Sequence, residues 1–172
     1  MTMPMTYWIV LAVALVACAT DLRSRRIPNL LTFGSAAAAI VFHGLSGGTD
    51  GLLAAGSGWL LGVAIFFLPF ALGGMGAGDV KLLAALGAWL GPSMTIWLAL
   101  YTGVAGGIAA LVVALLCGYL GTALRNIWLL MAHWRVSGLR PLGDVSLAEG
   151  SGPRLAYAVP IFIGTVVTLW LH

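Results

Sequence analysis

Long apolar runs dominate the chain, and short polar or glycine-rich segments separate them. A helix that crosses a bilayer needs about 20 mostly apolar residues, with a range of roughly 17–25. The pattern therefore predicts an all-α, polytopic membrane protein with about six transmembrane helices. We expect these spans at residues 4–20, 28–45, 52–72, 79–91, 94–120 and 155–171. The fourth span is short, and it ends at "GPS" (91–93), a breaker that predicts a tight turn.

The composition supports one membrane-embedded domain over residues 1–172. The chain is 61% hydrophobic and only 8% charged, against about 25% charged in ordinary soluble domains. Too few charges remain to cover the surface of a soluble protein. Cys18 and Cys117 each lie in an apolar run and form no C-x-x-C pair, and the three histidines are far apart. We therefore expect no disulfide framework, no metal site and no cofactor.

The basic residues predict the orientation in the membrane. With six alternating spans, all eight lysines and arginines fall on one side, in the segments that follow spans one, three and five. The positive-inside rule makes this side cytoplasmic and places both termini outside. The third of these segments, about 121–154, is the expected cytoplasmic loop. The net charge of +3, without a basic patch interleaved with aromatics, predicts lipid and not nucleic acid as the surroundings.

Glycines spaced four apart predict close helix packing. They occur in "GWLLG" (58–62), "GAWLG" (87–91) and "GVAGG" (103–107). Small residues at this spacing share one helix face and let two helices approach closely.

Two of the five acids, Asp21 and Asp79, fall at span ends on the same predicted side. Asp21 ends the first span and Asp79 begins the fourth. Ionisable groups at membrane depth are costly, and they are usually retained for a function. Two close carboxyl groups tend to share one proton, so that one can accept a proton from water while the other donates. Each acid also has a simpler reading, Asp79 as a helix cap and Asp21 as an interfacial counter-charge.

Both acids lie in sequence elements that resemble one family. "MGAGDVK" (75–81) resembles the M-x-G-x-G-D-x-K element of the prepilin peptidases, which are GxGD membrane aspartyl proteases. "DLRSRRIPN" (21–29) resembles the family's other signature, and the two elements occur in the family's order. "AYAVPIFIG" (156–164) is only loosely similar to the family's last helix.

The resemblance implies that Asp21 and Asp79 are a catalytic pair in a prepilin leader peptidase. It implies that the substrate is a type IV or Flp-type prepilin, or a pseudopilin, which is cleaved at the cytoplasmic face of the inner membrane. The large members of the family carry two C-x-x-C pairs and methylate the new pilin N-terminus. This chain has no C-x-x-C pair, so we expect a minimal form without methyltransferase activity.

The residues around the two acids leave several roles open. Gly76 and Gly78 carry no Cβ, so a substrate backbone could approach closely, or the loop could simply be flexible. Lys81 and Arg26 either snorkel and fix the topology or tune an aspartate. Asn29 is either a helix cap or a group that shapes the site.

Two other functions compete with the peptidase. A small transporter would relay protons through the two acids, but the residues in the middle of the spans form no polar path. A non-catalytic factor for secretion or pilus assembly would tolerate loss of either aspartate.

Overall fold

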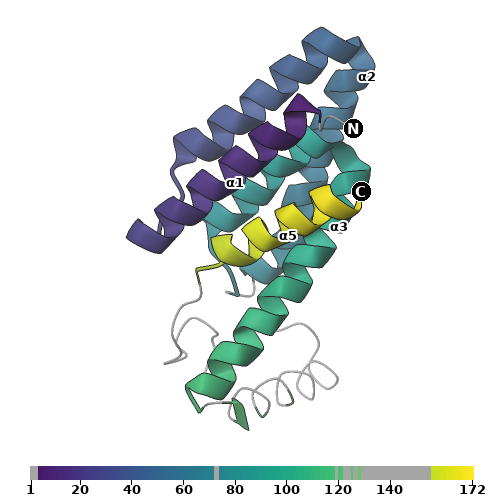
Figure 1. The fold of residues 1–172 in the computed structure, drawn as a ribbon. Coiled ribbons are helices and arrows are strands. Elements are labelled where there is room, and N and C mark those ends of the chain that lie inside the picture. Colours follow the sequence, from purple (N-terminus) through teal and green to yellow (C-terminus); the bar gives the residue numbers. More distant parts are fainter. Residues whose placement is uncertain (1–3, 72–73, 119, 122–124, 126–127, 129–155) are drawn as a thin grey trace.

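The fold of the protein, taken from a computed structural model, is all-α as predicted. The structure describes residues 4–71, 74–118, 120–121, 125, 128 and 156–172. These residues contain four helices and no strand (Figure 1): α1 (Met5–Ser24), α2 (Asn29–Ala71), α3 (Ala77–Leu116) and α5 (Ala158–Leu171). The helices α1, α2 and α3 are long and apolar enough to cross a membrane, and α5 is shorter. Apart from three residues, the expected loop at 121–154 lies outside the described part of the chain.

The two longest helices each bend at one glycine. Gly48 in α2 has φ 58° and ψ −136°, and Gly91 in α3 has φ 74° and ψ 174°. Positive φ is accessible to glycine at little steric cost. The bend at Gly91 coincides with the turn predicted at "GPS" (91–93), and the bend at Gly48 lies between the spans expected at 28–45 and 52–72. The described residues therefore form four helices where about six were predicted, because helical geometry is interrupted at only one residue in each bend.

The first half of α3 is the centre of the helix bundle. All residues from 82 to 89 are buried, and Leu82, Leu83 and Leu86 are among the largest fully buried side chains. α3 packs mainly on α2 and α5, while α1 packs on α5 and α3. A helix that is apolar on every side is expected at such a position.

Glycines allow α2 and α3 to approach each other closely. A Cβ added to Gly58 would meet the carbonyl group of Gly87, and one added to Gly62 would lie 2.8 Å from the Cα of Ala84. The predicted close packing is confirmed for these three glycines. In "GVAGG" only Gly106 is buried against another helix, and a Cβ added to Gly103 or Gly107 would meet nothing within 4 Å.

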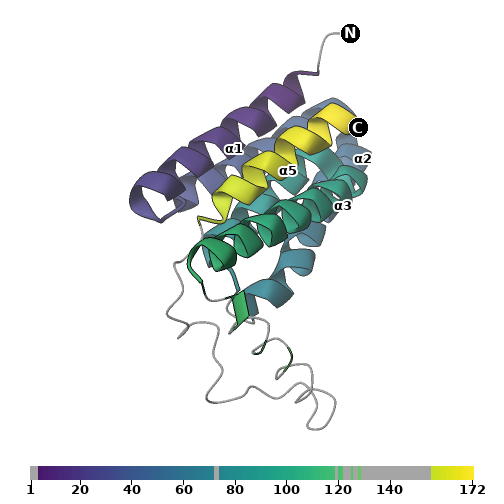
Figure 2. The ribbon, with the colours of Figure 1, turned by 60° about the horizontal axis from the view of Figure 1, so that its bottom comes forward.

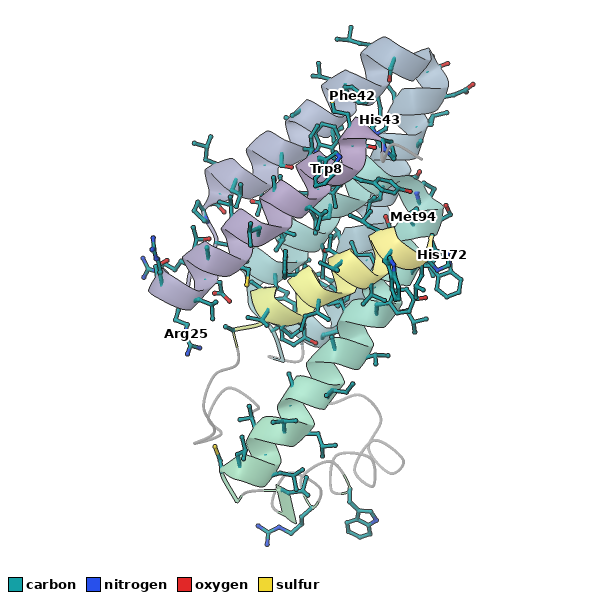
Figure 3. The ribbon with its side chains drawn as sticks, viewed as in Figure 1. Trp8, Arg25, Phe42, His43, Met94 and His172 are labelled. Carbon is teal, nitrogen blue, oxygen red and sulfur yellow. The ribbon has the colours of Figure 1, made fainter. Side chains whose placement is uncertain are left out.

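The bundle has two distinct ends. Both ribbon views place the N-terminus of α1 and the C-terminus of α5 at one end (Figures 1 and 2). Figure 3 shows Trp8, His43, Met94 and His172 toward this end, and Arg25 at the opposite one. The end marked by Arg25, where α1 finishes and α2 and α5 begin, is called the site end below.

Candidate active site

Asp21 lies within the last turn of α1. The helix continues to Ser24, so the prediction that Asp21 ends the first span was short by three residues. Arg25 ends the helix in the left-handed conformation, with φ 53°, and its N–H donates to the carbonyl oxygen of Asp21 over 2.8 Å. This bond closes the last turn in the manner of an αL cap. The Asp21 side chain is buried, with 8% of its surface exposed.

A backbone N–H from the far end of the sequence holds the Asp21 carboxylate. The N–H of Ala158 donates to Oδ2 of Asp21 over 3.5 Å, in a buried position. Ala158 is the first residue of α5, and first-turn N–H groups have no partner inside their own helix. The start of a helix also carries partial positive charge. The start of α5 therefore supplies a backbone partner for the Asp21 carboxylate.

The Asp79 carboxylate closes the start of its own helix. Asp79 is the third residue of α3, after the N-cap Gly76, and the N–H of Gly76 donates to its Oδ2 over 3.1 Å. Because glycine has no side chain, only this half of a capping box forms. Asp79 therefore caps the start of α3 through one carboxylate oxygen, but from the third helical position and not as the N-cap residue. Asp79 is also 8% exposed, and the neighbouring Met75 is buried in the core.

The structure brings the two aspartates to the same end of the bundle. A Cβ on Gly78 would contact Ile27, in the connection between α1 and α2, at 3.4 Å. The glycine segment before Asp79 therefore packs beside the end of the helix that carries Asp21. The two buried carboxylates therefore lie on neighbouring segments at the site end.

Tyr157 is a third polar residue near the aspartates. It is the N-cap of α5 and is half-buried. Burial, and then the negative charge of Asp79, raise the pKa of its phenol above the ordinary value. In the sequence, Tyr157 stood out only through a loose resemblance of "AYAVPIFIG" to the last helix of the family. A stronger signal was available, because its hydroxyl stands directly before the last apolar run.

The remaining predicted site residues have separate environments. The Nζ of Lys81 donates to Oδ1 of Asn29 over 3.0 Å and lies 5.2 Å from the centre of the Phe33 ring. Lys81 and Asn29 thus join the starts of α3 and α2. Arg26 is exposed in the connection between α1 and α2. The Cα of Gly76 faces the Asp79 carboxylate, since an added Cβ would lie 3.1 Å from Oδ2.

A comparison with known protein families shows the family to which the chain belongs. The sequence model of the type IV leader peptidase family matches residues 8–111, more than half of the chain. The chain belongs to the type IV leader peptidase family. The matched residues include both aspartates and end before α5. Comparisons with curated proteins and with solved structures find no match.

The groups at the site end suit acid–base chemistry on a peptide bond. Among the described residues of this leader peptidase family member, no group of three or more His, Cys, Asp and Glu side chains could hold a metal ion. The polar groups that the described residues bring together are two carboxylates, two backbone N–H donors and a phenol. Two interacting carboxyl groups can divide the roles of general base and general acid.

Proposed function

We propose that the protein is an aspartic endopeptidase that removes the leader peptide from type IV or Flp-type prepilins, or from pseudopilins. The observation that carries this proposal is the convergence of Asp21 and Asp79 in a member of the type IV leader peptidase family. Both side chains are buried at the same end of the bundle, although 58 positions separate them in the sequence, from residue 21 to residue 79.

The reaction divides the two carboxyl groups into a base and an acid. The ionised carboxylate removes a proton from a water molecule, whose oxygen attacks the carbonyl carbon of the scissile peptide bond. The protonated carboxyl group donates its proton to the carbonyl oxygen. The tetrahedral intermediate then collapses, the bond between carbon and nitrogen breaks, and a proton passes to the leaving amine. Close carboxyl groups share one proton readily, because both cannot easily ionise together.

The anchoring of the two side chains supports this division. Each aspartate uses Oδ2 to accept a backbone N–H, from Ala158 in one case and from Gly76 in the other. Neither of these two bonds engages Oδ1, which leaves that oxygen to act on water or on the substrate. A side chain held by one oxygen presents the other in a fixed direction, and such orientation lowers the barrier of the reaction.

We further propose that the chain crosses the inner membrane six times and that the site end faces the cytoplasm. The bends at Gly48 and Gly91 would then divide α2 and α3 into two crossings each. The exposed Arg23, Arg25 and Arg26 lie at the site end and satisfy the positive-inside rule there. A substrate would then be cut where its leader ends and its hydrophobic helix enters the membrane.

Co-expression with candidate prepilins from the same genome tests this function. The wild-type protein should shorten at least one prepilin by its leader, as seen by gel mobility and by mass spectrometry of the new N-terminus. The variants Asp21→Ala and Asp79→Ala should leave the leader attached. Normal processing by either variant would refute the proposed dyad. A failure of the wild type on every prepilin would refute the proposed substrate.

A further inference from the structure

We propose that Tyr157 is a positioning residue of the peptidase, whose ring, seated on Gly106 of α3, fixes the start of α5 and thereby the Asp21 carboxylate. This inference rests on the proposed function and adds a third residue to the same site. Tyr157 lies beyond the range matched by the family, which ends at residue 111.

The backbone around Tyr157 links this residue to Asp21. Its carbonyl oxygen accepts the N–H of Ile161 over 3.2 Å, so the first helical bond of α5 starts at this residue. The next N–H along the chain, that of Ala158, is the donor to Oδ2 of Asp21. Tyr157 and the group that holds Asp21 therefore share one peptide unit, and a shift of Tyr157 moves this donor.

The Tyr157 side chain packs against Gly106 of α3. Gly106 is buried in α3, and a Cβ added to it would lie 2.5 Å from the Tyr157 hydroxyl oxygen and 2.9 Å from Cζ. The ring thus occupies the space that a larger residue at position 106 would fill. Tyr157 is half-buried, and the part of its ring against Gly106 lies in a close-packed contact that restricts its placement. The contact fixes where α5 begins relative to α3.

Three contacts set the register of α5 along α3. His172 stacks on Trp97 with ring centroids 4.4 Å apart, and a Cβ on Gly164 would lie 2.7 Å from the backbone nitrogen of Thr102. With the contact of Tyr157 on Gly106, the two helices meet at three successive levels in antiparallel order. The Tyr157 level is the one at the site end. Both aspartates then depend on α3, Asp79 directly and Asp21 through the start of α5.

The charge of Asp79 reaches the same ring. Besides burial, it raises the pKa of the Tyr157 phenol, so Tyr157 lies within electrostatic range of one aspartate and covalently next to the donor for the other. This placement suits a residue that determines the position of the Asp21 carboxylate relative to that of Asp79. A misplacement of about 1 Å in a catalytic geometry can cost about 10²-fold in rate.

Purified full-length variants in detergent, assayed on a prepilin that the wild type cleaves, test this role. Tyr157→Ala removes the ring and should lower kcat by about 10²-fold. KM should change far less, because the proposed role of Tyr157 is exerted through the Asp21 carboxylate and not on the substrate. Tyr157→Phe keeps the ring and should retain most of kcat. Gly106→Ala should lower kcat in the same direction as Tyr157→Ala, since its Cβ displaces the ring.

The neighbouring glycines provide matched controls. Gly103→Ala and Gly107→Ala add the same methyl group to the same helix where nothing lies within 4 Å, and both should leave kcat unchanged. In the Tyr157→Ala background, Gly106→Ala should cause no further loss of kcat, because the two changes remove one contact. If Tyr157 served only fold stability, its substitution would lower the yield of folded protein. The effects of the Tyr157 and Gly106 substitutions on kcat would then not be coupled.

Several results would overturn the inference. Normal kcat in Tyr157→Ala, or equal losses in the three glycine variants, would show that the contact does not position Asp21. An equal loss in Tyr157→Phe and Tyr157→Ala would assign the effect to the hydroxyl instead of the ring. If Tyr157→Ala does not fold, the comparison of Gly106→Ala with Gly103→Ala decides the question. The inference fails alone if these variants are normal while Asp21→Ala is inactive, whereas an active Asp21→Ala refutes the proposed function itself.

Discussion

The two ends of the bundle satisfy their polar groups in different ways. At the end away from the site, Nε2 of His43 lies 3.1 Å from the carbonyl oxygen of Trp89, and His172 stacks on Trp97. At the site end, two buried carboxylates each accept one backbone N–H through Oδ2. The first arrangement joins helices to one another, and the second holds ionisable groups that can still act on another molecule.

The direction of the helices explains part of this difference. Both α3 and α5 begin at the site end, so two sets of first-turn N–H groups lie beside the two acids. Helix starts stabilise negative charge. At the other end, α1 begins without an acid in its first turn, and the chain turns at Gly48 and Gly91. Acids are therefore stable in this apolar bundle at the end where helices begin.

Substitution of either aspartate by asparagine should have the largest effect on kcat, and it distinguishes the capping role of the side chain from its chemical role. Asp79→Asn and Asp21→Asn keep an oxygen that can accept the backbone N–H, but an amide cannot act as a general base. We expect each variant to lose about 10³-fold or more in kcat, since residues that act as a unit carry most of the rate. The temperature of unfolding in detergent should change little.

The matched control is Asp50→Asn, in the bend of α2 far from the site in the sequence. Asp50 is exposed, so this change should leave both cleavage and stability unaltered. Loss of folding in Asp79→Asn together with loss of cleavage would contradict the distinction between the two roles.

The next largest effect concerns stability and lies in the packing of α2 on α3. Gly58→Ala would place a Cβ against the carbonyl group of Gly87. Overpacking of this kind costs typically about 1–3 kcal/mol, which denaturant unfolding in detergent would measure. Gly56→Ala is the control, because a Cβ there meets nothing within 4 Å. Equal stability of the two variants would show that the close approach of the helices is not required.

A smaller effect is expected from the aromatic stack at the end away from the site. His172→Ala removes the ring that lies 4.4 Å from Trp97. Aromatic pairs contribute about 0.5–1.5 kcal/mol beyond the burial of their area, so unfolding should become easier by about this amount. The kcat of the folded enzyme should remain within about threefold of the wild type, because the stack lies at the end away from the two aspartates. A threefold change corresponds to well under 1.4 kcal/mol in the barrier. A large loss of kcat would mean that the two ends are not independent.

The smallest effect is expected at the pair of Lys81 and Asn29. Their hydrogen bond is 3.0 Å long and exposed, and even a full ion pair at an exposed position contributes only about 0–1 kcal/mol. Lys81→Met and Asn29→Ala should therefore cleave a prepilin at nearly the wild-type rate. A loss of kcat comparable to that of Asp79→Asn would instead place Lys81 among the residues that act on the aspartate.

The sequence predicted the helices well because apolar runs and breakers are local signals. The bend at Gly91 falls inside the turn predicted from "GPS", and the bend at Gly48 falls between two expected spans. It also predicted that Asp21 and Asp79 would share one end, because this follows from the alternation of the spans. It could not predict that Ala158 holds Asp21, since a backbone N–H leaves no trace in the choice of side chain. Nor could it predict which glycine of "GVAGG" receives the Tyr157 ring, because the rotation of a helix about its axis depends on its neighbours.

If Asp21 and Asp79 act as one unit, a double-mutant cycle on single-turnover cleavage will show it. Asp21→Asn, Asp79→Asn and the double variant are compared with the wild type on the same prepilin. Groups that act together are strongly non-additive, so we predict that the double variant cleaves no more slowly than the slower single variant. Two large losses that multiply in the double variant, or a single variant that cleaves at the wild-type rate, would contradict the account.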